Sequence, residues 1–195
     1  MTAENIYLNY DKIDFDPQEP YLIDTSILVI SQSKKESEEK RNNAIFIIDF
    51  SLTAKYGCIS IQNFIEFVNI MKNKLKSIAD DLEIIETIND FNSVFKVLLY
   101  SPETINKAIN LSIERKVHFF DALLAQTMLD SNIHLIYTEN TKEFNKVPGI
   151  HAVNPFTDKK IARLCKKARK QQLNKEATDK QRSSKKATDK ISNKE

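Results

Sequence analysis

The sequence predicts an α/β fold, in which a mostly parallel β-sheet lies between layers of helices. Short apolar runs, typical of buried strands, alternate along the chain with longer segments that have helical spacing. Apolar residues make up 41% of the chain and include 11 Phe and 6 Tyr, which is enough for a hydrophobic core. The chain has 195 residues, which suits one packed domain of about 150 residues with short extensions.

Each element follows from its composition and from the residues at its ends. The first strand, 21–23, is apolar and stops at Asp, Thr and Ser (24–26), residue types that start helices. Ser, Pro and Glu at 101–103 start another helix, because Ser caps it, Pro suits its first position and Glu lies in its first turn. The expected strands are 21–23, 57–61, 94–99, 133–137 and 150–153. The expected helices are 24–30, 36–55, 62–75, 77–92, 101–115 and 119–131.

The net charge of +2 combines two regions of opposite sign. Residues 158–195 hold 14 Lys and Arg against 5 Asp and Glu, a net of +9, whereas the rest of the chain holds 15 against 22, a net of −7. We therefore expect an N-terminal leader at 1–19, a packed domain at 20–157 and a basic tail at 158–195. Within the tail, 159–173 can form a basic helix, and 175–195 is polar enough to stay disordered.

The composition excludes several classes of protein. No apolar run reaches the roughly 18 to 20 residues that a membrane helix needs, and the first residues lack the basic start and apolar centre of a secretory signal. Cys58 and Cys165 are too few for a disulfide framework or a cysteine zinc site, which suits a reducing cytoplasm. Three His without ligand-like spacing argue against zinc, and two Gly exclude a glycine-rich phosphate loop. We therefore expect a cytoplasmic protein with no membrane contact.

Polar, mostly acidic residues follow the strands of the predicted sheet. Asp24 ends the first strand, and Glu66 lies about one turn into the helix after the second strand. Asp121 lies in the first turn of the sixth helix, and Thr, Glu and Asn at 138–140 follow the fourth strand. Ligands of open parallel sheets bind beyond the carboxyl ends of the strands. Carboxylates that meet there repel each other unless a cation compensates, and oxygen ligands favour Mg²⁺ or Mn²⁺, which can activate water against a phosphodiester.

Each acidic residue also has an ordinary structural interpretation. Asp24 and Asp121 would then cap helices or complement helix dipoles. Glu66 would belong to a solvated stripe of Gln and Asn residues, although the apolar residues beside it predict a half-buried carboxylate. Glu139 and Glu143 would be exposed loop charges.

Five blocks of the sequence resemble, in order and spacing, the PIN-domain family, the metal-dependent ribonuclease fold that includes the toxins of many bacterial toxin–antitoxin pairs. The blocks are 21–26 (YLIDTS), 59–67 (ISIQNFIEF), 119–125 (FFDALLA), 136–140 (IYTEN) and 153–156 (VNPF). The resemblance covers about residues 20–157. It implies a PIN-like α/β/α sandwich with a mostly parallel central sheet, followed by a disordered or helical basic tail.

The resemblance also implies the chemistry of the acidic set. Asp24, Glu66 and Asp121 match the metal-site positions of the family, and Ser26 or Thr25 matches a polar residue that assists beside the metal ion. The implied cofactor is Mg²⁺ or Mn²⁺, and the implied reaction is hydrolysis of RNA that leaves a 3′-hydroxyl and a 5′-phosphate. The implied partners are RNA, a second copy in a homodimer and, for a toxin, an antitoxin protein that blocks the site.

One matched position departs from the family. Asn140 stands where Asp is frequent, so its amide oxygen can still complete the site, but one negative charge is lost and a second metal ion is in question. Thr138 and Glu139 beside it are candidate supporting residues, and Glu139 or Glu143 is a candidate for restoring the charge. The leading hypothesis is a metal-dependent endoribonuclease with Asn140 in the catalytic set. The alternatives are a catalytically weak or inactive RNA-binding module and a DNA-directed or structure-specific nuclease.

The basic tail predicts a second, electrostatic contact with RNA. Its first part is dense in cations, which bind backbone phosphates without selecting a sequence. No aromatic residue follows Phe156, so the tail offers no platform for stacking bases. The alternatives are a solvated extension, a cover for the acidic body or a contact with the ribosome. The candidate RNA-binding residues are Lys159, Lys160, Arg163, Lys166, Lys167, Arg169 and Lys170.

Overall fold

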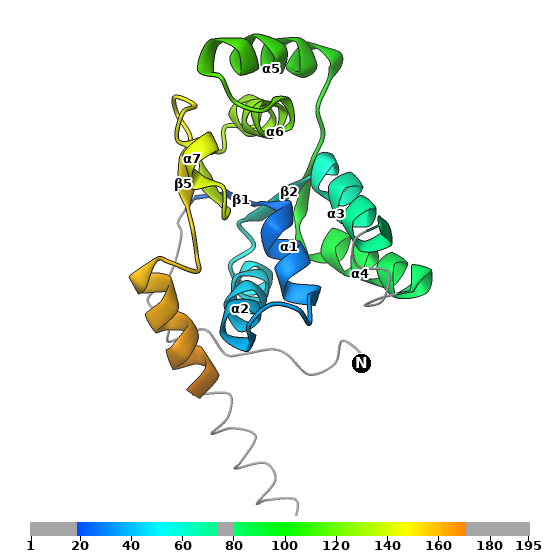
Figure 1. The fold of residues 1–195 in the computed structure, drawn as a ribbon, viewed down its shortest axis with the longest axis vertical. Coiled ribbons are helices and arrows are strands. Elements are labelled where there is room, and N and C mark those ends of the chain that lie inside the picture. Colours follow the sequence, from blue (N-terminus) through cyan, green and yellow to red (C-terminus); the bar gives the residue numbers. More distant parts are fainter. Residues whose placement is uncertain (1–18, 74–79, 171–195) are drawn as a thin grey trace, which may run out of the picture.

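The computed structural model describes residues 19–73 and 80–170 (Figure 1). Its strands are β1 (Tyr21–Ile23), β2 (Gly57–Ser60), β3 (Lys96–Leu98), β4 (Leu135–Tyr137) and β5 (His151–Val153). Its helices are α1 (Thr25–Gln32), α2 (Glu38–Ala54), α3 (Ile61–Asn73), α4 (Asp81–Val94), α5 (Pro102–Arg115), α6 (Phe119–Asp130), α7 (Thr141–Phe144) and a further helix at 159–170. Within these ranges, no helix combines the length and the apolar character needed to cross a lipid bilayer.

The described strands form a five-stranded sheet in the order β3-β2-β1-β4-β5, and all neighbouring strands are parallel. The expected α/β fold with a parallel central sheet is therefore confirmed. β1 lies at the centre, paired with β2 on one side and with β4 on the other. Because the strands point the same way, the residues that follow β1, β2 and β4 meet at one edge of the sheet, which we call the carboxyl edge.

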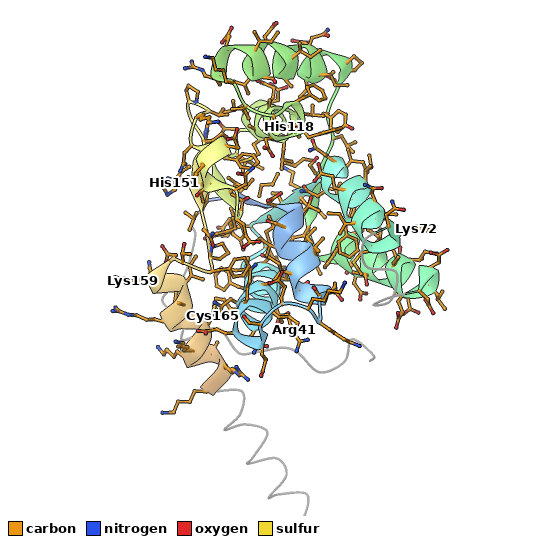
Figure 2. The ribbon with its side chains drawn as sticks, viewed as in Figure 1. Arg41, Lys72, His118, His151, Lys159 and Cys165 are labelled. Carbon is orange, nitrogen blue, oxygen red and sulfur yellow. The ribbon has the colours of Figure 1, made fainter. Side chains whose placement is uncertain are left out.

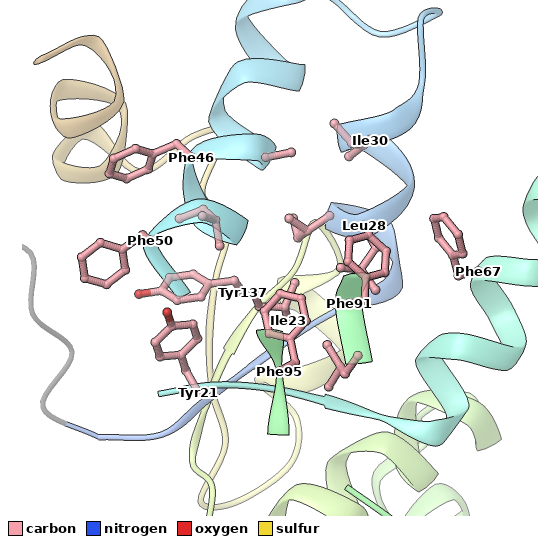
Figure 3. Close-up of a cluster of buried hydrophobic side chains, with 14 of the residues drawn as sticks. Tyr21, Ile23, Leu28, Ile30, Phe46, Phe50, Phe67, Phe91, Phe95 and Tyr137 are labelled. Carbon is pink, nitrogen blue, oxygen red and sulfur yellow. The ribbon is translucent and has the colours of Figure 1, made fainter. Parts of the chain in front are cut away.

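Side chains of each strand alternate between two hydrophobic cores, one on each face of the sheet. Tyr21 and Ile23 pack into the larger core with α1, α2, α3 and α4, whereas Leu22 between them packs into the second core with α6 and α7. Figure 1 shows α5 and α6 on one side of the sheet and α1 and α2 on the other. In the larger core the rings of Tyr21 and Tyr137 meet edge to face, with centroids 5.1 Å apart (Figure 3). The two cores hold β1, and with it the carboxyl edge, in a fixed position.

The helix at 159–170 packs against the larger core. Ile161, Cys165 and Ala168 share one helical face, and all three are buried in this core. The helix expected at 159–173 is thus present in its described part, and it carries core side chains beyond residue 157, where we placed the domain boundary. That boundary stays a prediction. The leader and the disorder of 175–195 also stay predictions, because the leader up to residue 18 and everything after residue 170 lie outside the described residues.

Three local details differ from the sequence prediction. α4 continues through Val94, expected as the start of a strand, because the N–H of Phe95 still bonds to the carbonyl of Phe91. β4 begins later than expected, because the N–H of Ile133 bonds back to the carbonyl of Met128 in the turn after α6. α7 was not predicted, because a helix of one turn leaves no periodic pattern in the sequence.

Candidate active site at the carboxyl edge

The four residues predicted as catalytic come from four segments that meet at the carboxyl edge. Asp24 directly follows β1, and Glu66 lies in α3, which directly follows β2. Asp121 lies in the first turn of α6, and Asn140 lies just before α7, beyond the end of β4. The pairing of β1 with β2 and β4 places Asp24 between the other segments. The structure therefore brings the four residues together, as the contacts below show.

Asp24 lies at the centre of this site. Its Oδ2 accepts hydrogen bonds from Ser26 Oγ and Thr138 Oγ1, each 2.7 Å long, and its backbone N–H donates to the carbonyl of Tyr137 over 3.0 Å. Asp24 occupies the N-cap position of α1, as the structural interpretation predicts, but its side chain makes no capping hydrogen bond to the helix. Burial raises the pKa of Asp24, hydrogen bonds from Thr138 and Ser26 oppose this, and the charge of Glu66 adds to it.

Glu66 is held by hydrogen bonds to both of its carboxylate oxygens. Oε2 accepts from Thr25 Oγ1 over 2.8 Å, and Oε1 accepts from Gln62 Nε2 over 2.7 Å. Thr25 in turn accepts a hydrogen bond from Asn63 Nδ2 over 2.9 Å, and Asn63 Oδ1 accepts from the N–H of Ser60 over 2.6 Å. This chain of bonds ties Glu66 to the end of β2. The carboxylate is half-buried, as its apolar neighbours predict, so it is not part of a solvated stripe.

Asp121 and Asn140 form the outer part of the site. Asn140 is exposed, and its Nδ2 donates a hydrogen bond of 3.1 Å to Asp121 Oδ2. Burial first, and then the charge of Asp24, raises the pKa of Asp121 to about 6, while His118 opposes the rise. A carboxylate at position 140 would add a further negative charge here. The amide adds a hydrogen-bond donor instead.

The donor set fits a hard divalent cation by chemistry and by charge. Asp24, Glu66 and Asp121 offer only oxygen atoms, the ligands that Mg²⁺ and Mn²⁺ prefer. Glu66 raises the pKa of Asp24, and both of these carboxylates raise the pKa of Asp121, so a bound cation would relieve a mutual repulsion. In the described part of the chain, no three Asp, Glu, His or Cys side chains lie close enough to share one ion as they stand.

A sequence profile of the PIN domain matches residues 21–150, a range that contains all four of these residues. The chain belongs to the PIN-domain family. The match starts at β1 and ends just before β5, so it includes all the segments that form the carboxyl edge. No curated protein matches this PIN-domain chain by sequence.

Several solved structures share the fold of this PIN-domain protein at low sequence identity. A DNA-bound VapBC from Salmonella typhimurium has 21% identity and a TM-score of 0.51, with 69% of this chain and 97% of that chain covered. VapBC-1 from nontypeable Haemophilus influenzae has 17% identity and a TM-score of 0.51, covering 71% and 98%. Mycobacterium tuberculosis VapC20, a sarcin–ricin loop cleaving toxin, has 14% identity and a TM-score of 0.50, covering 62% and 89%. At these identities the similarity concerns the fold alone.

The predicted supporting residues of the PIN-domain site separate into two groups. The hydroxyl groups of Thr25, Ser26 and Thr138 donate hydrogen bonds to the carboxylates of Glu66 and Asp24, as described above. Glu139, by contrast, lies 2.9 Å from Lys40 of α2 and does not join the carboxylate cluster. Glu143 lies 2.6 Å from Lys146, and it acts on the site through its charge, which raises the pKa of Asp121.

The seven candidate RNA-binding residues of the PIN-domain protein are all exposed on the helix at 159–170. Two of them contact acidic residues of α2: Lys166 lies 3.3 Å from Glu39, and Arg169 pairs with Glu38. Part of the basic helix therefore covers the acidic body, one of the alternatives that the sequence left open. Figure 2 shows Lys159, at the start of this helix, at the outer edge of the molecule.

The sequence reasoning missed Gln62 as a site residue. Its side chain is 4% exposed, and its Nε2 donates both to Glu66 Oε1 and, over 3.0 Å, to the backbone carbonyl of Phe120. A flipped amide would place an oxygen against these two acceptors, so the orientation of the amide is fixed. Among the described residues, Gln62 Oε1 is buried without a hydrogen-bond partner. The signal in the sequence was its position one helical turn before Glu66, next to apolar residues.

Proposed function

We propose that this PIN-domain protein is a metal-dependent endoribonuclease that hydrolyses RNA phosphodiester bonds. The observation that carries the proposal is the set of Asp24, Glu66 and Asp121, whose charges act on one another at the carboxyl edge. Keeping three such carboxylates together costs free energy unless a cation or a proton compensates. Membership of the PIN-domain family supports the same chemistry.

Asp24, Glu66 and Asp121 would hold Mg²⁺ or Mn²⁺. The ion, when bound, supplies the positive charge that activates water and stabilises the charge of a phosphodiester under in-line attack. The hydroxyl and amide groups around Asp24 and Glu66 keep these two carboxylates oriented. Asn140 holds Asp121 through its amide and leaves the site with one negative charge fewer than an Asp would. We expect products with a 3′-hydroxyl and a 5′-phosphate.

RNA, an antitoxin protein and a second copy of the chain are the partners that we propose. The Mycobacterium tuberculosis structure is of a toxin that cleaves the sarcin–ricin loop, and the Salmonella typhimurium structure is of a VapBC bound to DNA. The similarity to these structures supports RNA as the substrate and supports a role as the toxin of a toxin–antitoxin pair, with the antitoxin blocking the site. We place this activity in the cytoplasm. The exposed cations of the helix at 159–170 would add sequence-independent attraction for phosphates.

Asn140 favours a second candidate function, a catalytically weak or inactive RNA-binding module. With an amide in place of a carboxylate, the site attracts a second cation less strongly. The basic helix would then supply most of the RNA affinity. A DNA-directed or structure-specific nuclease is a third candidate, because the chemistry of the site does not distinguish the sugars.

The proposed activity is tested by RNA cleavage with Mg²⁺ or Mn²⁺. We expect the wild type to cleave and Asp24→Asn to lose activity by about 100-fold or more, because its carboxylate is central to the metal site. The matched control is Asp90→Asn, the same change at an exposed position of α4. In thermal unfolding, either cation should stabilise the wild type and the control but not Asp24→Asn, a readout that does not depend on activity.

Each outcome of this experiment decides between the candidates. Equal cleavage by the wild type and Asp24→Asn contradicts the assignment of the site. RNA binding without cleavage in either metal supports the RNA-binding module. Stronger competition by DNA than by RNA supports the DNA-directed nuclease.

A further inference from the structure

Three aromatic rings lie immediately beside the acidic site, at the start of α6. The ring centroids of His118 and Phe120 are 5.9 Å apart, with planes inclined by 32°, and those of Phe119 and Phe120 are 5.5 Å apart. His118 and Phe120 are exposed, and Phe120 keeps 51% of its surface accessible. Figure 2 shows His118 at α6, where the helix begins. Large aromatic side chains gain free energy from burial, so a half-exposed Phe next to a candidate catalytic carboxylate indicates a binding surface.

The backbone of Phe120 is tied directly to the acidic site. Its carbonyl accepts a hydrogen bond of 3.0 Å from Gln62 Nε2, and the same nitrogen donates to Glu66 Oε1 over 2.7 Å. The next residue along α6 is Asp121, so the backbone of Phe120 lies between Gln62, which bonds to Glu66, and Asp121. Its distance from the reacting phosphate would therefore be set by the fold and not by a mobile loop.

We propose that Phe120, together with His118, is a stacking platform for an unpaired nucleobase of the RNA substrate, next to the phosphodiester that is cut. This inference rests on the proposed function. Every nucleobase presents a π-face, so such a platform accepts any base. It therefore selects unpaired over base-paired RNA at the site and does not select a sequence.

The charge of the molecule favours a nucleobase as the occupant. Residues 1–157 carry a net charge of −7, and the carboxylates repel phosphates near the site until a cation is bound. Stacking needs no charge, so it can hold RNA where phosphate contacts are weakest.

The test measures binding of short single-stranded RNAs that carry 2-aminopurine at one position, a base whose fluorescence falls when it stacks. The full chain with Asp24→Asn is used, so that RNA is expected to bind without being cut. We expect one labelled position to be quenched. Phe120→Ala and Phe120→Leu should remove the quenching and weaken binding about ten-fold, whereas Phe120→Trp should keep both. The control is Tyr56→Ala, which removes an exposed aromatic just before β2, at the opposite edge of the sheet, and should leave binding unchanged.

The remaining outcomes overturn the platform in distinguishable ways. Equal losses in Phe120→Leu and Phe120→Trp, or in Tyr56→Ala, would mean that stacking at this ring does not hold the RNA. Unchanged binding in every Phe120 variant, while the wild type still cleaves RNA, overturns the platform and leaves the proposed function standing. If Phe120→Ala changes the oligomeric state of the protein but not its RNA binding, the ring belongs to a protein interface. Absence of both RNA binding and cleavage by the wild type overturns the platform and the proposed function together.

Discussion

The two halves of the acidic site are held very differently. The inner half, Asp24 and Glu66, accepts four side-chain hydrogen bonds of 2.7 to 2.8 Å from hydroxyl and amide groups. In the outer half, the link among the described residues is one bond of 3.1 Å from the exposed amide of Asn140 to Asp121. The inner half is therefore held by more and shorter hydrogen bonds than the outer half.

This difference follows from where the partners of each half lie. Thr25 and Thr138, which hold the inner half, are 3% and 0% exposed, and they also bond to other parts of the protein. Their hydroxyl groups are therefore part of the folded core, and removing them costs stability. Asn140 is exposed and Asp121 is half-buried, so changes there should act more on charge and metal binding than on folding.

The largest effect on stability is expected when the inner half is broken at Thr138. Thr138→Val keeps the shape but removes the donor to Asp24 Oδ2 and the acceptor of the Asn140 N–H. We expect a loss of about 1 to 3 kcal/mol in the free energy of unfolding at neutral pH, because a buried bond to a carboxylate is lost. Denaturant titration of the metal-free protein measures this loss.

The matched control for this change is Thr127→Val. Thr127 is 1% exposed, and its hydroxyl donates to the carbonyl of Leu123 within α6. That bond involves no charged group, so we expect a loss of less than about 1 kcal/mol. If Thr138→Val costs no more than Thr127→Val, the hydroxyl does not stabilise the inner carboxylate and the contrast between the halves fails.

A smaller effect, of opposite sign, is expected when charge is removed from the outer half. The pKa of Asp121 is about 6 in the folded protein against an ordinary value of 3.8. The folded state binds the proton more tightly, so the stability of the wild type falls as the pH rises from about 4 to above 6. Asp121→Asn removes this dependence. It should stabilise the metal-free protein at pH 7 by about 1 kcal/mol, after allowing for the partial exposure of the carboxylate, and leave it unchanged near pH 4.

Asp130, at the other end of α6, is the control, because its pKa is shifted in the direction opposite to that of Asp121. Burial raises its pKa, but hydrogen bonds from Thr104, Gln126 and Lys107 bring it below its ordinary value. Its contribution to stability is therefore present at pH 7 and is lost as the pH falls through its folded pKa. Asp130→Asn should destabilise the protein at pH 7, and unfolding at pH 4 and pH 7 measures both variants. If Asp121→Asn destabilises the protein at pH 7, the negative charge of Asp121 does not lower the stability of the folded state.

The sequence predicts the membership of the site better than its internal contacts. Asp24 and Glu66 could be grouped because they follow apolar strands, and parallel strands place their ends together. Asp121 follows helix α5, and the resemblance to the PIN-domain family is what matched it to the metal-site positions. The bond from Thr138 to Asp24 joins residues far apart in the chain, and its partners depend on packing that no local pattern encodes. For the same reason the amide of Gln62, which bonds to both α3 and α6, could not be assigned from the sequence.

The basic helix shows a second limit of the sequence. Its charge suggested a tail, and charge dominates the composition of this segment. The apolar residues Ile161, Cys165 and Ala168 recur at helical spacing, but three small or medium side chains give a weak signal among seven cations. Only the packing against α2 and the larger core shows that this stripe is buried.

The smallest effect on stability and cleavage is expected from a change at Glu139. This change tests whether Glu139 replaces the negative charge that Asn140 lacks. Its side chain is 40% exposed and pairs with Lys40, which also lies 3.2 Å from Glu36. Glu139→Gln leaves Lys40 with this second partner, so we expect a change of about 0.5 kcal/mol or less in stability and cleavage within about two-fold of the wild type. Glu66→Gln makes the same chemical change inside the bonded inner half and should abolish metal-dependent cleavage. If both variants lose cleavage equally across a Mg²⁺ titration, Glu139 compensates for Asn140, and the outer half extends beyond the pair described here.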